Sequence, residues 1–110
     1  MNARFRFTVV LAAIDDYATI KQVHLCLEAQ TIRRELEIQF VCRSRARLDL
    51  PTGFADEYPD IEIIEGGENL LLNEARELGI RRASSLFVLI LEDHCLPWPQ
   101  CLEHMPVSYT

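Results

Sequence analysis

The sequence predicts an α/β fold in which a mostly parallel sheet lies between two layers of helices. Residues 7–14 and 86–91 are almost continuous apolar runs, and such runs, unlike alternating ones, are typical of strands buried on both faces. Helical patterns separate the strands along the chain, and that order favours parallel pairing with right-handed crossovers. Because 110 residues are close to the commonest size of a domain, we expect residues 1–110 to form one domain.

The chain begins with the first of these strands. Residues 7–14 end at Asp15 and Asp16, and the side chain of either acid can cap a helix by accepting hydrogen bonds from its first free N–H groups. The pattern that follows predicts a helix over 18–30. The apolar positions at helical spacing in it are Ile20, Val23 and Leu27.

A second and a third strand come next. Residues 36–41 are rich in β-branched and aromatic side chains, which predicts a strand. Residues 43–60 contain prolines and a glycine that break regular structure, so we expect this stretch to be irregular. Residues 61–65 alternate apolar and acidic side chains, as a shorter and less buried strand does, and Gly66-Gly67 then turns the chain.

The remaining part of the chain predicts a helix, the central strand and a last helix. Asn69 can cap the first of these helices, and Gly79 stands where a C-cap glycine belongs. Residues 86–91 then form a strand that we expect to be central and buried on both faces. The last short helix opens at Pro97 and Pro99 and carries Leu102 and Met105. Trp98, between the two prolines, is expected to cover the core.

The charge balance argues against nucleic acid as a partner. The chain has 17 Asp and Glu against 11 Lys and Arg, a net charge of −6, whereas a protein that binds nucleic acid usually presents a basic face. The acids Glu62, Glu65 and Glu68 are interpreted as a solvated face.

The cysteines and the hydropathy pattern favour a cytoplasmic protein. None of the four cysteines has CxxC spacing, so we expect buried free thiols in a reducing compartment. No apolar run approaches the ~20 residues of a membrane span. Arg4 and Arg6 precede an apolar run as in a secretory signal, but no small-residue cleavage site follows, and we interpret the run as the first strand.

Acidic residues follow two of the predicted strands. Asp15-Asp16 come after the first strand, and Glu92, Asp93 and His94 (the acidic tip) come after residues 86–91. In open α/β sheets ligands bind beyond the carboxyl ends of parallel strands. Carboxylates with an imidazole suit a divalent ion such as Mg²⁺ or Mn²⁺, which would in turn hold a diphosphate. The alternative is that these acids only cap helices and solvate strand ends.

A zinc site is a weaker alternative. His94, Cys95, Cys101 and His104 supply the right ligand types, but their spacings follow no standard zinc arrangement. Neighbouring residues at a strand end also point in opposite directions.

Three segments, taken in order, carry a resemblance to a known family. They are residues 7–15, the LCLEAQT sequence at 25–31, and LNEARELGIRRASSLFVLILEDH at 72–94. Together they resemble the N-terminal, donor-binding half of a family-2 glycosyltransferase, an inverting group with the GT-A fold. The resemblance covers about residues 7–105.

The resemblance implies a nucleoside-diphosphate sugar as ligand. Ala13, Ile14 and Asp15 match the turn that touches the nucleotide. Glu92 and Asp93 match the acidic D-x-D motif at the donor diphosphate, and Asp93 with His94 would hold Mn²⁺ or Mg²⁺. In the family the second strand ends in an aspartate that contacts the base, whereas Cys42-Arg43 stand there in this chain.

The resemblance leaves two functions open. The family's catalytic base lies in its acceptor half, so no catalytic residue is assigned here, and we expect a truncated transferase domain. The alternative is a non-catalytic interaction module that keeps the fold and self-associates through an uncovered sheet edge. A response-regulator receiver fits less well, because Asp16 and Asp93 are too far apart in the sequence.

Overall fold

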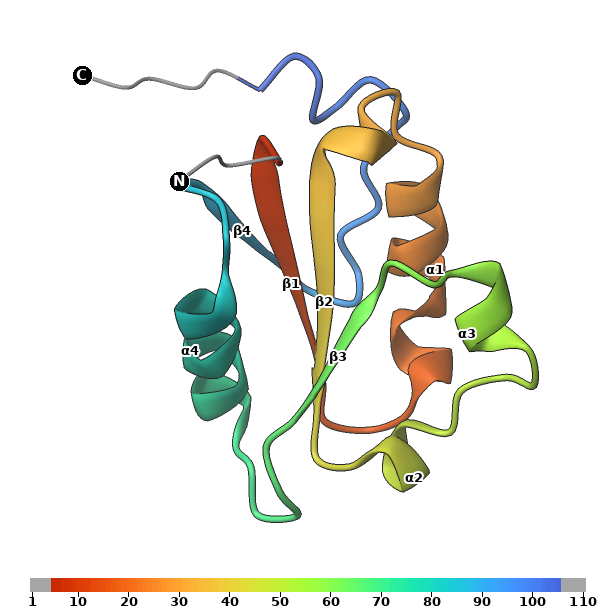
Figure 1. Cartoon of the computed structure of the whole chain (residues 1–110), viewed down its shortest axis with the longest axis vertical. Helices are drawn as coiled ribbons and strands as arrows, with labels where there is room; N and C mark the ends of the chain where they lie inside the picture. Colours follow the sequence, from red (N-terminus) through yellow and green to blue (C-terminus); the bar gives the residue numbers. More distant parts are fainter. Residues whose placement is uncertain (1–4, 106–110) are drawn as a thin grey trace.

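The computed structural model describes residues 5–105 and contains one sheet of four parallel strands in the order β3-β2-β1-β4. The strands are β1 (Phe7–Ala13), β2 (Leu36–Cys42), β3 (Glu62–Glu65) and β4 (Val88–Leu91). The helices are α1 (Tyr17–Glu28), α2 (Arg45–Leu48), α3 (Phe54–Glu57) and α4 (Leu72–Arg82), with a 3-10 turn η1 (Arg33–Glu35). Figure 1 shows α4 on one side of the sheet and α1 on the other. The predicted three-layer α/β fold with a parallel sheet is confirmed.

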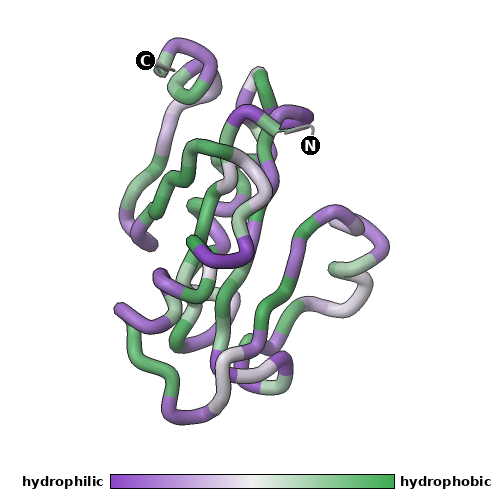
Figure 2. The backbone as a smooth tube through the Cα atoms, turned by 60° about the vertical axis from the view of Figure 1, so that its left-hand side comes forward, coloured by the Kyte–Doolittle hydropathy of each residue, from purple (hydrophilic) through white to green (hydrophobic). Residues whose placement is uncertain are grey.

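The sheet buries a separate core on each face, because successive side chains of a strand point to opposite sides. On β1, Val9 and Leu11 pack into the larger core beneath α1, whereas Val10 faces α4. The core beneath α4 has five buried members: Val10, Val41, Ile64, Leu70 and Ala75. In Figure 2 long hydrophobic stretches run along the strands, whereas hydrophilic residues are frequent in the helices as well as in the loops.

The first strand and helix lie where the sequence predicts them, but the expected helix cap does not form. Asp16 occupies the N-cap position of α1, and its side chain makes no capping hydrogen bond. Its backbone carbonyl instead accepts hydrogen bonds from the N–H and the hydroxyl of Thr19, at 3.2 and 2.8 Å. The start of α1 is therefore stabilised by Thr19.

The stretch 43–60 is more ordered than predicted. It contains the one-turn helices α2 and α3, which each bury one apolar side chain, Leu48 and Phe54. Ser44 caps α2, because its hydroxyl accepts a hydrogen bond from the N–H of Arg47 at 3.1 Å. Helices of one turn are too short to show a periodic apolar pattern. The prolines and the glycine of this stretch therefore led to the prediction of irregular structure.

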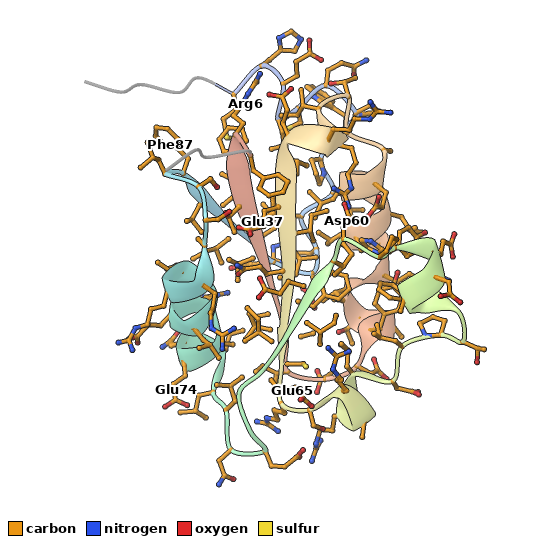
Figure 3. The ribbon with its side chains drawn as sticks, in the orientation of Figure 1. Arg6, Glu37, Asp60, Glu65, Glu74 and Phe87 are labelled. Carbon is orange, nitrogen blue, oxygen red and sulfur yellow. The ribbon has the colours of Figure 1, made fainter. Side chains whose placement is uncertain are left out.

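The chain turns after β3 as predicted. Gly67 has a φ of 103°, a conformation that few residues other than glycine adopt. Of the acids nearby, Glu65 and Glu68 are exposed while Glu62 is half-buried. Each of the three carboxylates contacts an arginine residue. That of Glu65, at the lower end of β3 (Figure 3), accepts a hydrogen bond from the backbone N–H of Arg45. Glu68 forms an ion pair with Arg47, and Glu62 forms one with Arg82.

Both predicted ends of α4 are corrected by the structure. Asn69 does not cap it; the N-cap residue is Leu71, whose N–H donates to the carboxylate of Glu74 at 2.9 Å. Gly79 is no C-cap, since α4 continues to Arg82. A Cβ atom on Gly79 would lie 2.5 Å from Cγ1 of Val10. The glycine therefore allows α4 to lie close to β1.

The strand expected at the centre of the sheet is at its edge. Residues 88–91 pair with β1 alone among the described strands. Their side chains are at most half-buried, with Ile90 38% exposed, and Leu86 before them is 77% exposed. The prediction of full burial was wrong, because an apolar run does not distinguish a covered strand from an edge strand.

The segment 97–105 forms successive turns and no helix, which corrects the last predicted element. Leu102 is nevertheless buried in the core beneath α1. Trp98 is 73% exposed, so the expectation that it covers the core was wrong. Turn hydrogen bonds within the segment, such as that from the N–H of Cys101 to the carbonyl of Trp98, are joined by hydrogen bonds to Gln30 and Thr31, described below.

Candidate functional site

A pocket of about 420 Å³ lies at the carboxyl ends of β1 and β4. We call it the strand-end pocket. Residues from β1, β4, α1, α4 and the loop after β2 line it: Ala12, Ile14, Asp15, Thr19, Ile20, Arg43, Leu71, Leu72, Arg76, Leu91, Glu92 and Asp93. Parallel strands end at the same edge, so segments distant in sequence meet here.

The structure brings together four of the residues singled out from the sequence. Ile14 and Asp15 follow β1, Glu92 and Asp93 follow β4, and all four line the strand-end pocket. Ala13 does not line it, because its side chain is 1% exposed and packs in the core beneath α1. The juxtaposition follows from the direct pairing of β1 with β4.

The acidic tip forms a compact group of charges. His94 places Nε2 3.2 Å from a carboxylate oxygen of Glu92, and Nδ1 3.4 Å from one of Asp93. These three side chains are 53–77% exposed. The backbone turns here, since the N–H of Cys95 donates to the carbonyl of Glu92 at 3.0 Å. His94 itself lies outside the pocket lining.

Two arginines of the pocket were not predicted from the sequence. Arg76, on α4, lies with Nη2 3.5 Å from a carboxylate oxygen of Glu92. Arg43 follows β2, and its Nε donates to the carbonyl of Leu70 at 3.1 Å. The sequence could have indicated Arg43, because this residue follows a parallel strand as Asp15 does. No local sequence pattern indicates Arg76, because whether its side chain reaches the pocket depends on how α4 packs on the sheet.

The pocket combines apolar and charged walls. Leu71 and Leu72 are 61% and 44% exposed and contribute an apolar side. Arg43 and Arg76 bring positive charge close to the carboxylates of Asp15, Glu92 and Asp93. The pocket thus offers an apolar side together with groups of both charges.

Within residues 5–105, no group of three or more His, Cys, Asp and Glu side chains is arranged to hold a metal ion. Cys95 and Cys101, members of the zinc set considered above, are free thiols. At the acidic tip, the imidazole of His94 is directed at the two carboxylates.

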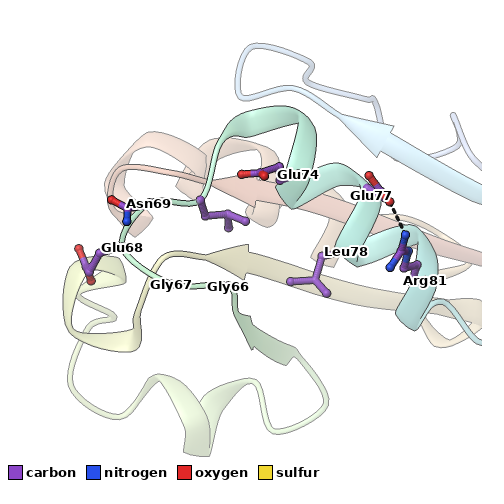
Figure 4. Close-up of a pocket in the computed structure, with 9 residues that line it drawn as sticks. Gly66, Gly67, Glu68, Asn69, Glu74, Glu77, Leu78 and Arg81 are labelled. Carbon is purple, nitrogen blue, oxygen red and sulfur yellow. Dashed lines mark hydrogen bonds and ion pairs between the residues drawn. The ribbon is translucent and has the colours of Figure 1, made fainter.

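A second hollow, of about 540 Å³, lies beside α4 and the loop after β3 (Figure 4). Gly66, Gly67, Glu74, Leu78 and Arg81 are among its lining residues. Its arginine is already paired, with Nη2 2.5 Å from a carboxylate oxygen of Glu77. This hollow includes none of the predicted site residues.

Comparisons with known proteins identify the family. No curated protein matches the chain significantly. In the described part of the chain, no helix has the length and apolarity needed to cross a membrane. The sequence model described as Glycosyl transferase family 2 matches residues 8–105, which include every element of the sheet apart from the first residue of β1. The chain therefore belongs to glycosyl transferase family 2.

Proposed function

We propose that the strand-end pocket binds a nucleoside-diphosphate sugar for inverting glycosyl transfer. One observation carries this proposal: Asp15, Glu92 and Asp93 line a single pocket at the carboxyl edge of a parallel sheet, in a chain of this family. A volume of about 420 Å³ lies in the usual range for small-molecule sites.

The walls of the pocket suggest how the donor would lie. Asp15 accepts hydrogen bonds from the nucleoside, and the apolar side formed by Leu71 and Leu72 contacts its flat or carbon-rich parts. Arg76 and Arg43 offset the negative charge of the diphosphate. Arg76 is already paired with Glu92, so a diphosphate would compete with that carboxylate or share the guanidinium with it.

The donor chemistry of the acidic tip fits a divalent metal ion. Carboxylate oxygens suit both Mg²⁺ and Mn²⁺, and an imidazole suits Mn²⁺. Asp93 and His94 would hold the ion, with Glu92 beside them. When bound, the ion supplies positive charge that stabilises the departing nucleoside diphosphate.

In the proposed reaction, an acceptor oxygen forms a bond to the anomeric carbon as the bond from that carbon to the diphosphate oxygen breaks. Direct displacement inverts the configuration of the anomeric carbon. The acceptor proton leaves to a base that we do not assign to any residue of this chain. The residues of the strand-end pocket orient the donor and stabilise the leaving group.

Calorimetric titration of UDP, GDP, ADP and CDP, each with and without Mn²⁺, tests this proposal. We expect at least one diphosphate to bind, more tightly with Mn²⁺, and Asp93→Ala to weaken binding about tenfold or more. Asp56→Ala, which removes an exposed carboxylate on α3, serves as the matched control and should bind like the unaltered protein. Failure of every diphosphate to bind would refute the proposal.

A second candidate function is that of an interaction module. β4 and the segments on either side of it expose large apolar side chains: Leu86, Ile90, Leu96 and Trp98. An edge strand with exposed apolar side chains favours pairing with another chain. Under this alternative the protein dimerises through β4, and Ile90→Lys makes it monomeric in sedimentation velocity. A monomer that binds a diphosphate would exclude the alternative.

A further inference from the structure

Gln30 connects the end of α1 to the segment that follows the acidic tip. Its side chain is almost completely buried. The amide nitrogen donates to the carbonyl of Trp98 at 2.8 Å and lies 3.4 Å from the carbonyl of Pro97 and 3.2 Å from that of Cys26. The amide oxygen accepts a hydrogen bond from the N–H of Leu102 at 3.1 Å. One side chain thus holds a distant segment at two points.

The neighbouring residue strengthens this attachment. The N–H of Thr31 donates to the carbonyl of Pro99 at 2.9 Å, and its hydroxyl donates to the carboxylate of Glu103. Leu102 is buried in the core beneath α1. The segment 97–103 is therefore docked on the end of α1, although it forms no helix.

The attachment lies very close in sequence to the acidic tip. The tip begins at Glu92, directly after β4, and the turn that contains it closes at Cys95 through the hydrogen bond to the carbonyl of Glu92. Only Leu96 separates this turn from Pro97. Because both ends of so short a segment are fixed, movement at Trp98 would displace the tip.

We infer that Gln30 is a positioning residue for the acidic tip. It acts through Pro97 and Trp98 and touches neither Glu92 nor Asp93. The expected effect of Gln30 on ligand binding rests on the proposed function, whereas its expected effect on the position of the acidic tip does not. Glutamine suits the role because one side chain supplies both the donor for the two carbonyls and the acceptor for the N–H of Leu102.

The test uses Gln30→Met, which keeps the length and packing of the side chain and removes its hydrogen bonds. Gln22→Ala, at an exposed position of the same helix, is the control. Amide hydrogen exchange is measured without ligand at Cys95, Leu102 and Phe40, the last reporting on global stability. We expect exchange at Cys95 and Leu102 to become about tenfold faster in Gln30→Met, relative to Phe40, and to stay unchanged in Gln22→Ala.

The same variants are then titrated with the diphosphate that the unaltered protein binds best, in the presence of Mn²⁺. A displaced tip weakens binding about tenfold in Gln30→Met alone, whereas a purely structural role leaves the affinity of the folded protein unchanged. Unchanged exchange at Cys95 would overturn the inference whatever the titration shows. If the unaltered protein binds no diphosphate, the proposed function fails, and exchange at Cys95 still decides whether Gln30 positions the tip.

Discussion

The two faces of the sheet are stabilised in different ways. Beneath α1, Tyr17, Phe40, Phe54 and Tyr58 surround the buried ring of His24, with centroids 4.6–5.7 Å from it. The polar atoms of this face are paired, since Nδ1 and Nε2 of His24 each lie 2.8 Å from a partner, the hydroxyl of Tyr17 and the carboxylate of Glu28. Burial raises the pKa of Tyr17 to about 12.

The face beneath α4 is smaller and less completely paired. α4 buries only Ala75 and Gly79. Gln39 of β2 is fully buried, and neither polar atom of its side chain has a hydrogen-bond partner among residues 5–105. The contrast indicates that α1 supplies most of the buried volume, whereas α4 depends on close fit. α4 also carries Arg76, so the smaller, less completely paired face holds part of the strand-end pocket.

The same substitution on the two faces gives the largest expected effect. Leu→Ala changes in protein cores cost about 2–5 kcal/mol, depending on how far the site can collapse. Leu11→Ala, at the centre of the core beneath α1, should fall near the upper end of that range. Leu70→Ala, at the margin of the core beneath α4, should fall near the lower end. Urea denaturation of both variants measures the difference, and equal losses would contradict the comparison.

An added methyl group tests whether α4 depends on close fit. Gly79→Ala places a Cβ atom 2.5 and 2.9 Å from the two methyl groups of Val10. Overpacking of this kind costs about 1–3 kcal/mol, which exceeds the gain of up to about 1 kcal/mol that alanine brings to a helix interior. Val10→Ala should relieve the clash, so the double variant should lose less stability than the sum of the single ones in a double-mutant cycle.

The features predicted correctly depend on patterns that lie within one element. The apolar run at 7–14, the spacing of Ile20, Val23 and Leu27, and the residues of 36–41 each specify a strand or helix locally, and their order implies the parallel sheet. The meeting of Asp15 with Glu92 and Asp93 followed from the same order, because parallel strands end at one edge.

The features that were missed depend on contacts between elements. The position of β4 at the sheet edge follows from its pairing with β1 alone, which its apolar residues do not encode. Gly79 lies inside α4 because the helix approaches Val10. The segment 97–105 forms turns that are docked by hydrogen bonds with Gln30, so Pro97 and Pro99 do not begin a helix.

The smallest expected effect is a pH dependence of stability that arises at Glu28, on the face beneath α1. Burial alone would raise the pKa of Glu28, but hydrogen bonds from His24 and Arg33 and the charge of Arg33 together hold it below its usual value. An acid with a lowered pKa stabilises the folded state above its unfolded pKa, about 4.3 for Glu, and this contribution is lost as the pH falls through the lower, folded value. The free energy of unfolding should therefore decrease less steeply below about pH 4.3 in Glu28→Gln than in the unaltered protein.

Urea denaturation between about pH 3 and 6 measures this slope. Glu57→Gln, at an exposed position of α3, controls for the loss of one carboxylate and should leave the slope nearly unchanged. Equal slopes in Glu28→Gln and the unaltered protein would mean that the ion pair of Glu28 with Arg33 contributes little in solution, whereas the pair of Arg33 with Asp60 (labelled in Figure 3) is present in both proteins. The carboxylate of Glu28 would then add little to the stability of the face beneath α1, and the comparison with the α4 face would rest mainly on buried volume.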